Sequence, residues 1–192
     1  MLFPEIKSVI KSEYEELTFN DFHIGYKMLD FWKWSMSNIL SNTDRGVLAE
    51  FIVATAIGFD NPIRNDWDSY DLTADNGRIK IEVKSSAYIQ SWEQSKLSTI
   101  IFSIRESGCW DSKTNTYSDS KRHSDLYVFC LLKHKEQETL DPLKLEQWEF
   151  YVVKTEILNK YERSKVSITL NSLRKLTDAI SYSQLREKIF EM

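Results

Sequence analysis

The sequence predicts an α/β or α+β protein in which a mixed sheet follows a helical N-terminal segment. Three observations predict this class. Apolar residues recur at helical spacing over the first sixty residues. A hairpin pattern follows at residues 68–86, where Asp-Asn-Gly separates two short alternating runs. Runs rich in β-branched and aromatic residues come next, at 96–104, 124–132 and 146–154.

The N-terminal segment is expected to contain three helices. The helical spacing of apolar residues covers 3–17 and then 29–39, where Asn20 and Asp21 would start the second helix. Thr43 and Asp44 can cap a third helix, which would end at Gly58. All three helices would precede the first strand.

The hairpin and the three later runs give at least five strands. Residues 155–163 and the segment after Asn171 are expected to be helical, with a short strand at 167–170 between them. The polar stretch 107–125 is predicted to be a mobile loop. The 192 residues therefore form one domain, with N-terminal helices at 1–42, a core at 43–154 and a C-terminal helical extension at 155–192.

Composition indicates a soluble protein of the cytoplasm. Its 42% apolar residues can build a core, and the sequence has neither a run long enough to span a membrane nor an export signal. Cys109 and Cys130 form no CxxC pair, which argues for a reducing compartment. The net charge of -4 argues against a basic nucleic-acid surface, although residues 154–192 carry 8 basic and 5 acidic side chains, a local charge of +3. Motifs for nucleotide binding and serine hydrolysis are absent from the sequence.

Charged residues face each other across the predicted hairpin. If Asn76-Gly77 is a two-residue turn, paired residue numbers sum to 153, and Asp71 stands opposite Glu82. Two carboxylates about 5 Å apart repel by about 3 kcal/mol at an effective dielectric constant near 20. Alternation puts Lys84 on the same face as Glu82, with Ile79, Ile81 and Val83 packed inward. Lys84 supplies one positive charge, and a hard divalent cation such as Mg²⁺ would supply two.

Glu50 is the only charged residue in the apolar run 47–57. A carboxylate in such surroundings is costly unless it is paired. Two interpretations stay open: Glu50 lies beside Asp71 and Glu82, or it forms a buried ion pair with a Lys or Arg, Lys84 included.

Together, Glu50, Asp71, Glu82 and Lys84 resemble the motif of the PD-(D/E)xK nuclease superfamily, over residues 43–132. Tyr70 stands where the superfamily has its proline. The resemblance implies a restriction-endonuclease-like α/β core, with a mixed sheet of about five strands flanked by helices and preceded by the N-terminal helical segment. It also implies an endonuclease of restriction or defence type that hydrolyses DNA phosphodiester bonds with Mg²⁺, or with Mn²⁺ as a substitute.

The resemblance also implies a role for each residue. Asp71, Glu82 and the backbone carbonyl of Val83 would hold the metal, and Glu50 would contribute directly or through water. Lys84 would orient or deprotonate the attacking water. Three residues that follow the motif are weaker candidates for phosphate contacts: Ser86, Tyr88 and Gln90.

Other interpretations of the sequence stay open. The chain could be a non-catalytic nucleic-acid-binding or assembly protein that keeps a nuclease-like core, or a nuclease that acts on RNA. Taken alone, Asp71 and Lys84 would be ordinary solvated strand residues. Trp92 and Trp110 fit either a core or base stacking, and the run 121–123 fits either a solvated loop or a phosphate contact. A homodimer is also left open, and no membrane partner is expected.

Overall fold

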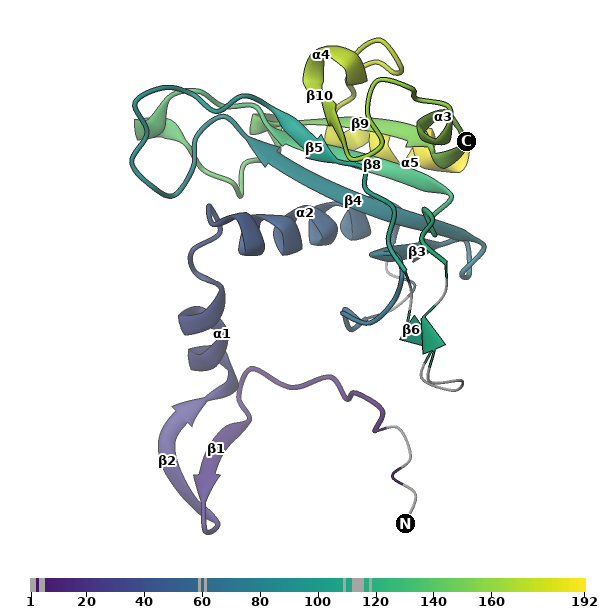
Figure 1. Cartoon of the computed structure of the whole chain (residues 1–192). Helices are drawn as coiled ribbons and strands as arrows, with labels where there is room; N and C mark the ends of the chain where they lie inside the picture. The colour runs from purple at the N-terminus through teal and green to yellow at the C-terminus, as the bar shows by residue number, and fades with distance from the viewer. Residues whose placement is uncertain are drawn as a thin grey trace.

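A mixed four-stranded sheet forms the centre of the protein in this computed structural model, which describes residues 3, 6–58, 60, 62–108, 110–111, 116–117 and 119–192. The strand order is β3 (Leu72–Ala74), β4 (Ile79–Ala87), β8 (Leu126–Leu132) and β9 (Trp148–Lys154) (Figure 1). β4 and β8 run parallel, whereas the two outer pairs are antiparallel. The predicted class, a mixed sheet flanked by helices, is confirmed. No helix among the described residues combines the length and apolarity needed to cross a membrane.

Helices cover both faces of this sheet. On one face, Ile81 and Val83 of β4 pack against α2 (Asn42–Ile57) and α5 (Leu185–Phe190). On the other face, Tyr127 and Phe129 of β8 pack in a second core that includes residues of α3 (Thr155–Asn159) and α4 (Leu170–Leu173). All seven residues of β8 are buried, as expected for a strand covered on both sides.

The helix predicted to end at Gly58 is confirmed as α2. Its N-cap is Ser41, two residues before the predicted cap, and the Ser41 hydroxyl accepts a hydrogen bond from the Asp44 N–H at 3.1 Å. Gly58 ends the helix with a φ of 88°, and its N–H donates to the Ala54 carbonyl. Figure 1 shows α2 running along the sheet beside β4, which fixes Glu50 close to the predicted hairpin.

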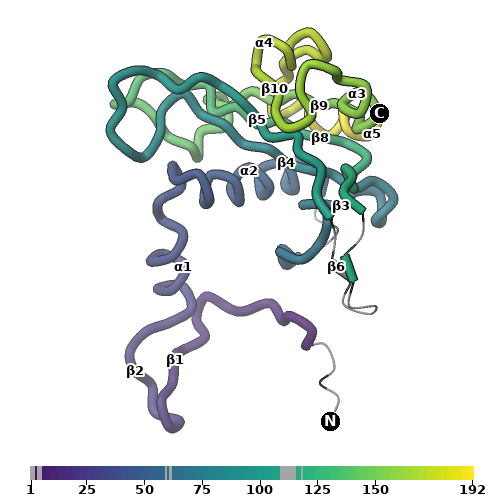
Figure 2. The backbone as a smooth tube through the Cα atoms, viewed as in Figure 1, coloured from purple at the N-terminus to yellow at the C-terminus, as the bar shows by residue number. Residues whose placement is uncertain are grey.

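The prediction of two helices before α2 is wrong in part. β1 (Glu16–Phe19) and β2 (Phe22–Lys27) form a hairpin, and α1 (Met28–Met36) follows it directly. Asn20 and Asp21 have φ angles of 48° and 64°, so they form the hairpin turn rather than a helix start. Residues 6–12 form neither helix nor strand. Figure 2 shows this whole segment projecting away from the sheet.

The shorter strands and helices show the outcome of the remaining secondary-structure predictions. The strand expected at 96–104 is β5 (Ile101–Ser103), which pairs with β10 (Ser167–Thr169) outside the main sheet. Within the polar stretch 107–125, β6 (Trp110–Asp111) pairs with β7 (Thr116–Tyr117). Residues 109, 112–115 and 118 lie outside the described residues. The prediction of a mobile loop at 107–125 therefore falls partly outside them, and Cys109 falls wholly outside them. Three single-turn 3₁₀ helices complete the chain: Gln137–Thr139, Leu145–Gln147 and Tyr182–Gln184.

Candidate active site

The β3–β4 hairpin has the predicted register. Leu72 pairs with Ile81, and the next two pairs continue with sums of 153. Asn76 and Gly77 occupy the two central turn positions with φ angles of 56° and 80°, and the Arg78 N–H donates to the Asp75 carbonyl at 3.3 Å. This short-range turn chemistry therefore positions Asp71, one residue before β3, beside Glu82 in the middle of β4.

Asp71 and Glu82 line one cleft. The Asp71 Oδ2 atom accepts a hydrogen bond from the Val83 backbone N–H at 2.6 Å, which fixes the carboxylate against β4. The Lys84 Nζ atom lies 2.5 Å from the Glu82 Oε1 atom, in an ion pair on the same face of the strand. The structure thus brings together three predicted site residues: Asp71, Glu82 and Lys84. The other residues that line the cleft come from the preceding loop and from a later one: Asp66, Trp67, Asp68, Ser69, Tyr70, Ser107, Gly108 and Tyr117.

Glu50, a buried carboxylate, forms an ion pair with Arg64, whose side chain is 39% exposed and which the sequence did not indicate as a site residue. The Arg64 Nε atom lies 2.5 Å from the Glu50 Oε2 atom, and Nη2 donates to Oε1 at 3.0 Å. The side chain of Glu50 is only 11% exposed. The ion-pair interpretation therefore holds, although the partner is Arg64 and not Lys84. Arg64 also contacts Asp66, at the rim of the cleft.

The negative charges of Glu82 and Glu50 act on the carboxyl group of Asp71. The pKa of Asp71 is raised to about 7, first by burial and then by the charges of Glu82 and Glu50, against the opposing effects of Lys84 and the Val83 N–H. Tyr127, which pairs with Glu82 across β4 and β8, has its pKa raised to about 12 by burial and then by Glu82. Glu50 thus lies close enough to influence Asp71 while its own charge is matched by Arg64.

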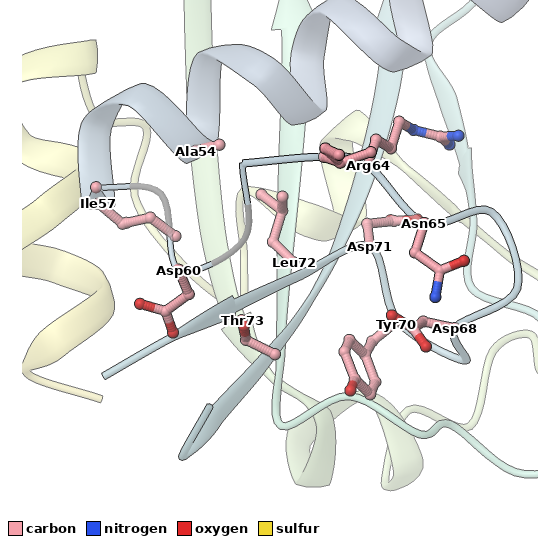
Figure 3. A pocket seen from close by; sticks show the side chains of 12 residues that line it. Ala54, Ile57, Asp60, Arg64, Asn65, Asp68, Tyr70, Asp71, Leu72 and Thr73 are labelled. Atoms are coloured by element: carbon pink, nitrogen blue, oxygen red, sulfur yellow. The ribbon is translucent and has the colours of Figure 1, made fainter. Parts of the chain in front are cut away.

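A second pocket adjoins the cleft on the other side of Asp71. Figure 3 shows Asp71 and Arg64 among the residues that line it, between the end of α2 and β3. Asp60, on the loop after α2, accepts a hydrogen bond from the Gly77 N–H at 3.0 Å and so ties this loop to the hairpin turn. Asp71 therefore lines both cavities and lies at the boundary between them.

The side chains at this site suit a hard cation in their chemistry. Carboxylate and carbonyl oxygens are the ligands that Mg²⁺ takes in proteins. Asp71 is the one of the three carboxylates that lacks a cationic hydrogen-bond partner among the described residues, and its pKa is raised by burial and then by the charges of Glu82 and Glu50. The described residues nevertheless include no group of three His, Cys, Asp or Glu side chains already arranged around a metal position.

The weaker phosphate-binding candidates lie outside this cleft. Gln90 donates to the Ala87 carbonyl at 2.8 Å and accepts a hydrogen bond from Arg45, so its amide belongs to an internal network. Tyr88 packs against the second core, with the Lys135 Nζ atom 4.6 Å from its ring centroid. Ser86 lies half-buried further along β4. Their proposed contacts with phosphate stay predictions.

The basic run at 121–123 has a structural role at its central residue. The side chain of Arg122 is fully buried and donates to the Ile104 carbonyl at 2.9 Å. It also donates to Glu106, Asn159 and the Lys165 carbonyl. Both interpretations of Arg122, as a solvated side chain and as a phosphate contact, are therefore wrong. Trp92 is 54% exposed, whereas the side chain of Trp110 lies outside the described residues.

Comparison with known families supports a nuclease. Residues 21–184 match the family model described as bacteriophage T4 endonuclease IV. The matched range includes β2, α1, α2, the hairpin and the whole central sheet. No curated protein matches the chain.

Proposed function

The chain belongs to the bacteriophage T4 endonuclease IV family. From this family, and from the carboxylates and the lysine of the β3–β4 hairpin, we propose that it is a Mg²⁺-dependent DNA endonuclease of the PD-(D/E)xK type. Its active site would be the cleft lined by Asp71 and Glu82, together with Lys84, which pairs with Glu82. The observation that carries the proposal is geometric: Asp71 and Glu82 line one cleft, the Val83 N–H fixes the Asp71 carboxylate, and Lys84 pairs with Glu82 on the same strand. The raised pKa of Asp71, caused first by burial and then by Glu82 and Glu50, supports it. A role in restriction or defence is proposed from the superfamily resemblance, and a cytoplasmic location from the composition and the cysteines.

Specific residues would hold the metal. Asp71 and Glu82 would provide carboxylate oxygens and Val83 its backbone carbonyl, with Glu50 contributing directly or through water. Bound Mg²⁺ supplies Lewis-acid polarisation of a phosphoryl oxygen and lowers the pKa of a water molecule.

Two neighbouring interactions orient the side chains. The Val83 N–H fixes the orientation of the Asp71 carboxylate before substrate binds, so binding has no further entropy cost for ordering this side chain. Glu82 pairs with the Lys84 ammonium on the same face of β4, and Lys84 would donate a hydrogen bond to the attacking water or to a phosphate oxygen. Trp67, 84% exposed at the rim of the cleft, is available to stack on a base.

A cleavage assay with paired variants tests this assignment. The substrates are supercoiled plasmid, single-stranded DNA and RNA, each with Mg²⁺ and with EDTA as control. Lys84→Ala is expected to abolish cleavage while metal binding persists, whereas Glu82→Ala is expected to abolish both. Lys154→Ala, which changes a half-buried lysine at the end of β9, is the matched control and should cleave like the parent.

Three outcomes would contradict parts of the proposal. Equal cleavage by the parent and by Lys84→Ala would remove Lys84 from the mechanism. Cleavage that persists in EDTA would remove the metal. Cleavage of RNA in preference to both forms of DNA would replace the substrate by RNA and keep the same active site.

A further inference from the structure

The N-terminal arm, defined as residues 6–36, exposes an unusual amount of apolar surface. Fourteen of its large apolar side chains are at least 36% exposed, including Ile6 at 92%, Phe22 at 78% and Trp34 at 83%. No residue of α1 is buried. Figures 1 and 2 show the arm extending away from the sheet and its covering helices. Soluble monomers rarely expose an apolar patch of this extent, and such patches mark interaction surfaces.

The described contacts hold the arm together internally but not to the rest of the chain. The Met28 N–H donates to the Glu15 carbonyl at 2.8 Å, and all described hydrogen bonds of residues 11–36 have both partners within 11–37. The described members of both hydrophobic cores come from Leu40 onward. An isolated two-stranded hairpin and a nine-residue helix are each only marginally stable in water. An ordered arm therefore requires a surface that covers it.

The charge and side-chain types of the arm favour a protein as that surface. The arm carries four lysines and five acidic residues, a net charge of -1. Nucleic acids and anionic membranes instead require clustered positive charge. Half of the fourteen exposed side chains are aliphatic, among them Ile6, Leu17 and Ile24. Aliphatic side chains cannot provide the base stacking on which single-stranded nucleic-acid binding depends.

We propose that the arm is a homodimerisation surface, on which the arms of two copies of the chain pack about a two-fold axis. At about 200 Å² for a whole aromatic side chain, the seven exposed aromatic residues of the arm leave roughly 900 Å² of aromatic surface in water. A standard interface buries about 800 Å² on each partner. The arm is therefore large enough to form a stable dimer without contributions from the rest of the chain.

Two features favour an identical copy over an unrelated protein. The near-zero net charge of the arm lets two identical surfaces approach without strong repulsion. β1 and β2 form a two-stranded sheet, so each strand has an unpaired outer edge that can add a strand from a second hairpin. Contacts between identical patches close on themselves as a dimer and do not extend into filaments.

Sedimentation of the full chain tests the proposal. The parent is expected to sediment with twice the monomer mass of 22.7 kDa at micromolar concentrations. Phe22→Asp and Trp34→Asp are expected to sediment as monomers. Leu143→Asp is the matched control, since Leu143 is 68% exposed outside the arm, and it should stay dimeric. Monomeric parent at all concentrations, or dimeric arm variants, would overturn the proposal.

Amide hydrogen exchange provides a second test that needs no variant. Residues 16–36 of the parent should gain protection as its concentration rises, whereas β8 should stay protected throughout. Equal exchange of residues 16–36 at all concentrations would contradict the proposal. A parent monomer that binds vesicles, DNA or a different protein through the arm would also contradict it.

Discussion

Replacing Asp71 by Asn is expected to stabilise the metal-free protein at pH 8. The reason is the raised pKa of this carboxyl, about 7 in the folded protein against an ordinary value of 3.8. A raised pKa means that the folded state favours the protonated form. The stabilisation from that proton is fully present below pH 3.8 and is lost as the pH rises through 7. At pH 8 the parent must keep a charged carboxylate beside Glu82 and Glu50, and the variant has no such charge.

The size of the effect follows from the two pKa values. At 1.36 kcal/mol per pKa unit, the ionised Asp71 destabilises the folded state by about 4 kcal/mol above pH 7. The difference between parent and variant should fall below roughly 1 kcal/mol at pH 4, where the folded state is protonated and the unfolded state, near its ordinary pKa of 3.8, is partly protonated as well. For a chain of this length, about 4 kcal/mol corresponds to about 10 °C in melting temperature. Asn keeps the size of the side chain and an oxygen that can accept from the Val83 N–H, so packing changes little.

Thermal melts of parent and variant between pH 4 and pH 8, with EDTA and with Mg²⁺, measure this effect. With EDTA, Asp71→Asn should melt above the parent at pH 8 and close to it at pH 4. Mg²⁺ should raise the melting temperature of the parent at pH 8, since a ligand of the native state stabilises it, and should not raise that of the variant. Asp178→Asn, at an exposed aspartate outside the hairpin, is the control and should show neither change. A variant that melts below the parent at pH 8 would refute the argument from charge.

Three further predictions concern residues around the site and the fold. Arg64→Ala leaves the buried carboxylate of Glu50 without its half-exposed partner, so the free energy of unfolding without metal should fall by roughly 1–3 kcal/mol at pH 8. Mg²⁺ should raise the melting temperature of this variant by more than it raises that of the parent. Arg122→Met removes a fully buried guanidinium from four acceptors and should cost about 3 kcal/mol in urea unfolding, whereas Arg163→Met, outside this network, should change little. Gly77→Ala places a side chain at a φ of 80° and should destabilise by about 1 kcal/mol, with full cleavage activity retained, because the turn lies away from the cleft.

The part of the site that could be predicted from the sequence, the position of Asp71 beside Glu82, depends only on short-range turn and strand geometry. Asn76-Gly77 selects a tight turn, the turn fixes the register, and the two-residue period of a strand fixes which side chains share a face. None of these steps needs information about distant parts of the chain. The position of Asp71 relative to Glu82 could therefore be predicted from the sequence alone, whereas the partner of Glu50 could not. Arg64 lies in an irregular loop 14 residues after Glu50, and no periodic pattern relates two such residues.

The N-terminal prediction failed for a related reason. Helical spacing of apolar residues predicts a helix only because one face of a helix is normally buried against a core. Residues 6–17 are not packed on a core in the single chain, and so their spacing carries no such information. The fold of this segment depends instead on the turn at Asn20 and Asp21. Both residue types are common at helix starts and in hairpin turns, so the sequence alone does not distinguish the two. Tertiary burial, which the sequence does not display, separates the two interpretations.

The balance of charge at the site gives the mechanism its physical basis. Five carboxylates lie at the site, with Asp66 and Asp68 of the cleft lining added to Glu50, Asp71 and Glu82, whereas Arg64 and Lys84 contribute two positive charges. The group therefore carries -3 when all seven side chains are ionised, and these side chains alone would repel a DNA phosphodiester, which carries -1. A divalent cation changes the sum to -1 and so weakens this repulsion. The same addition would lower the pKa of Asp71, because positive charge favours the ionised carboxylate. Metal binding and substrate binding at this site are therefore expected to be coupled, with DNA affinity falling in EDTA in the parent and much less in Asp71→Asn.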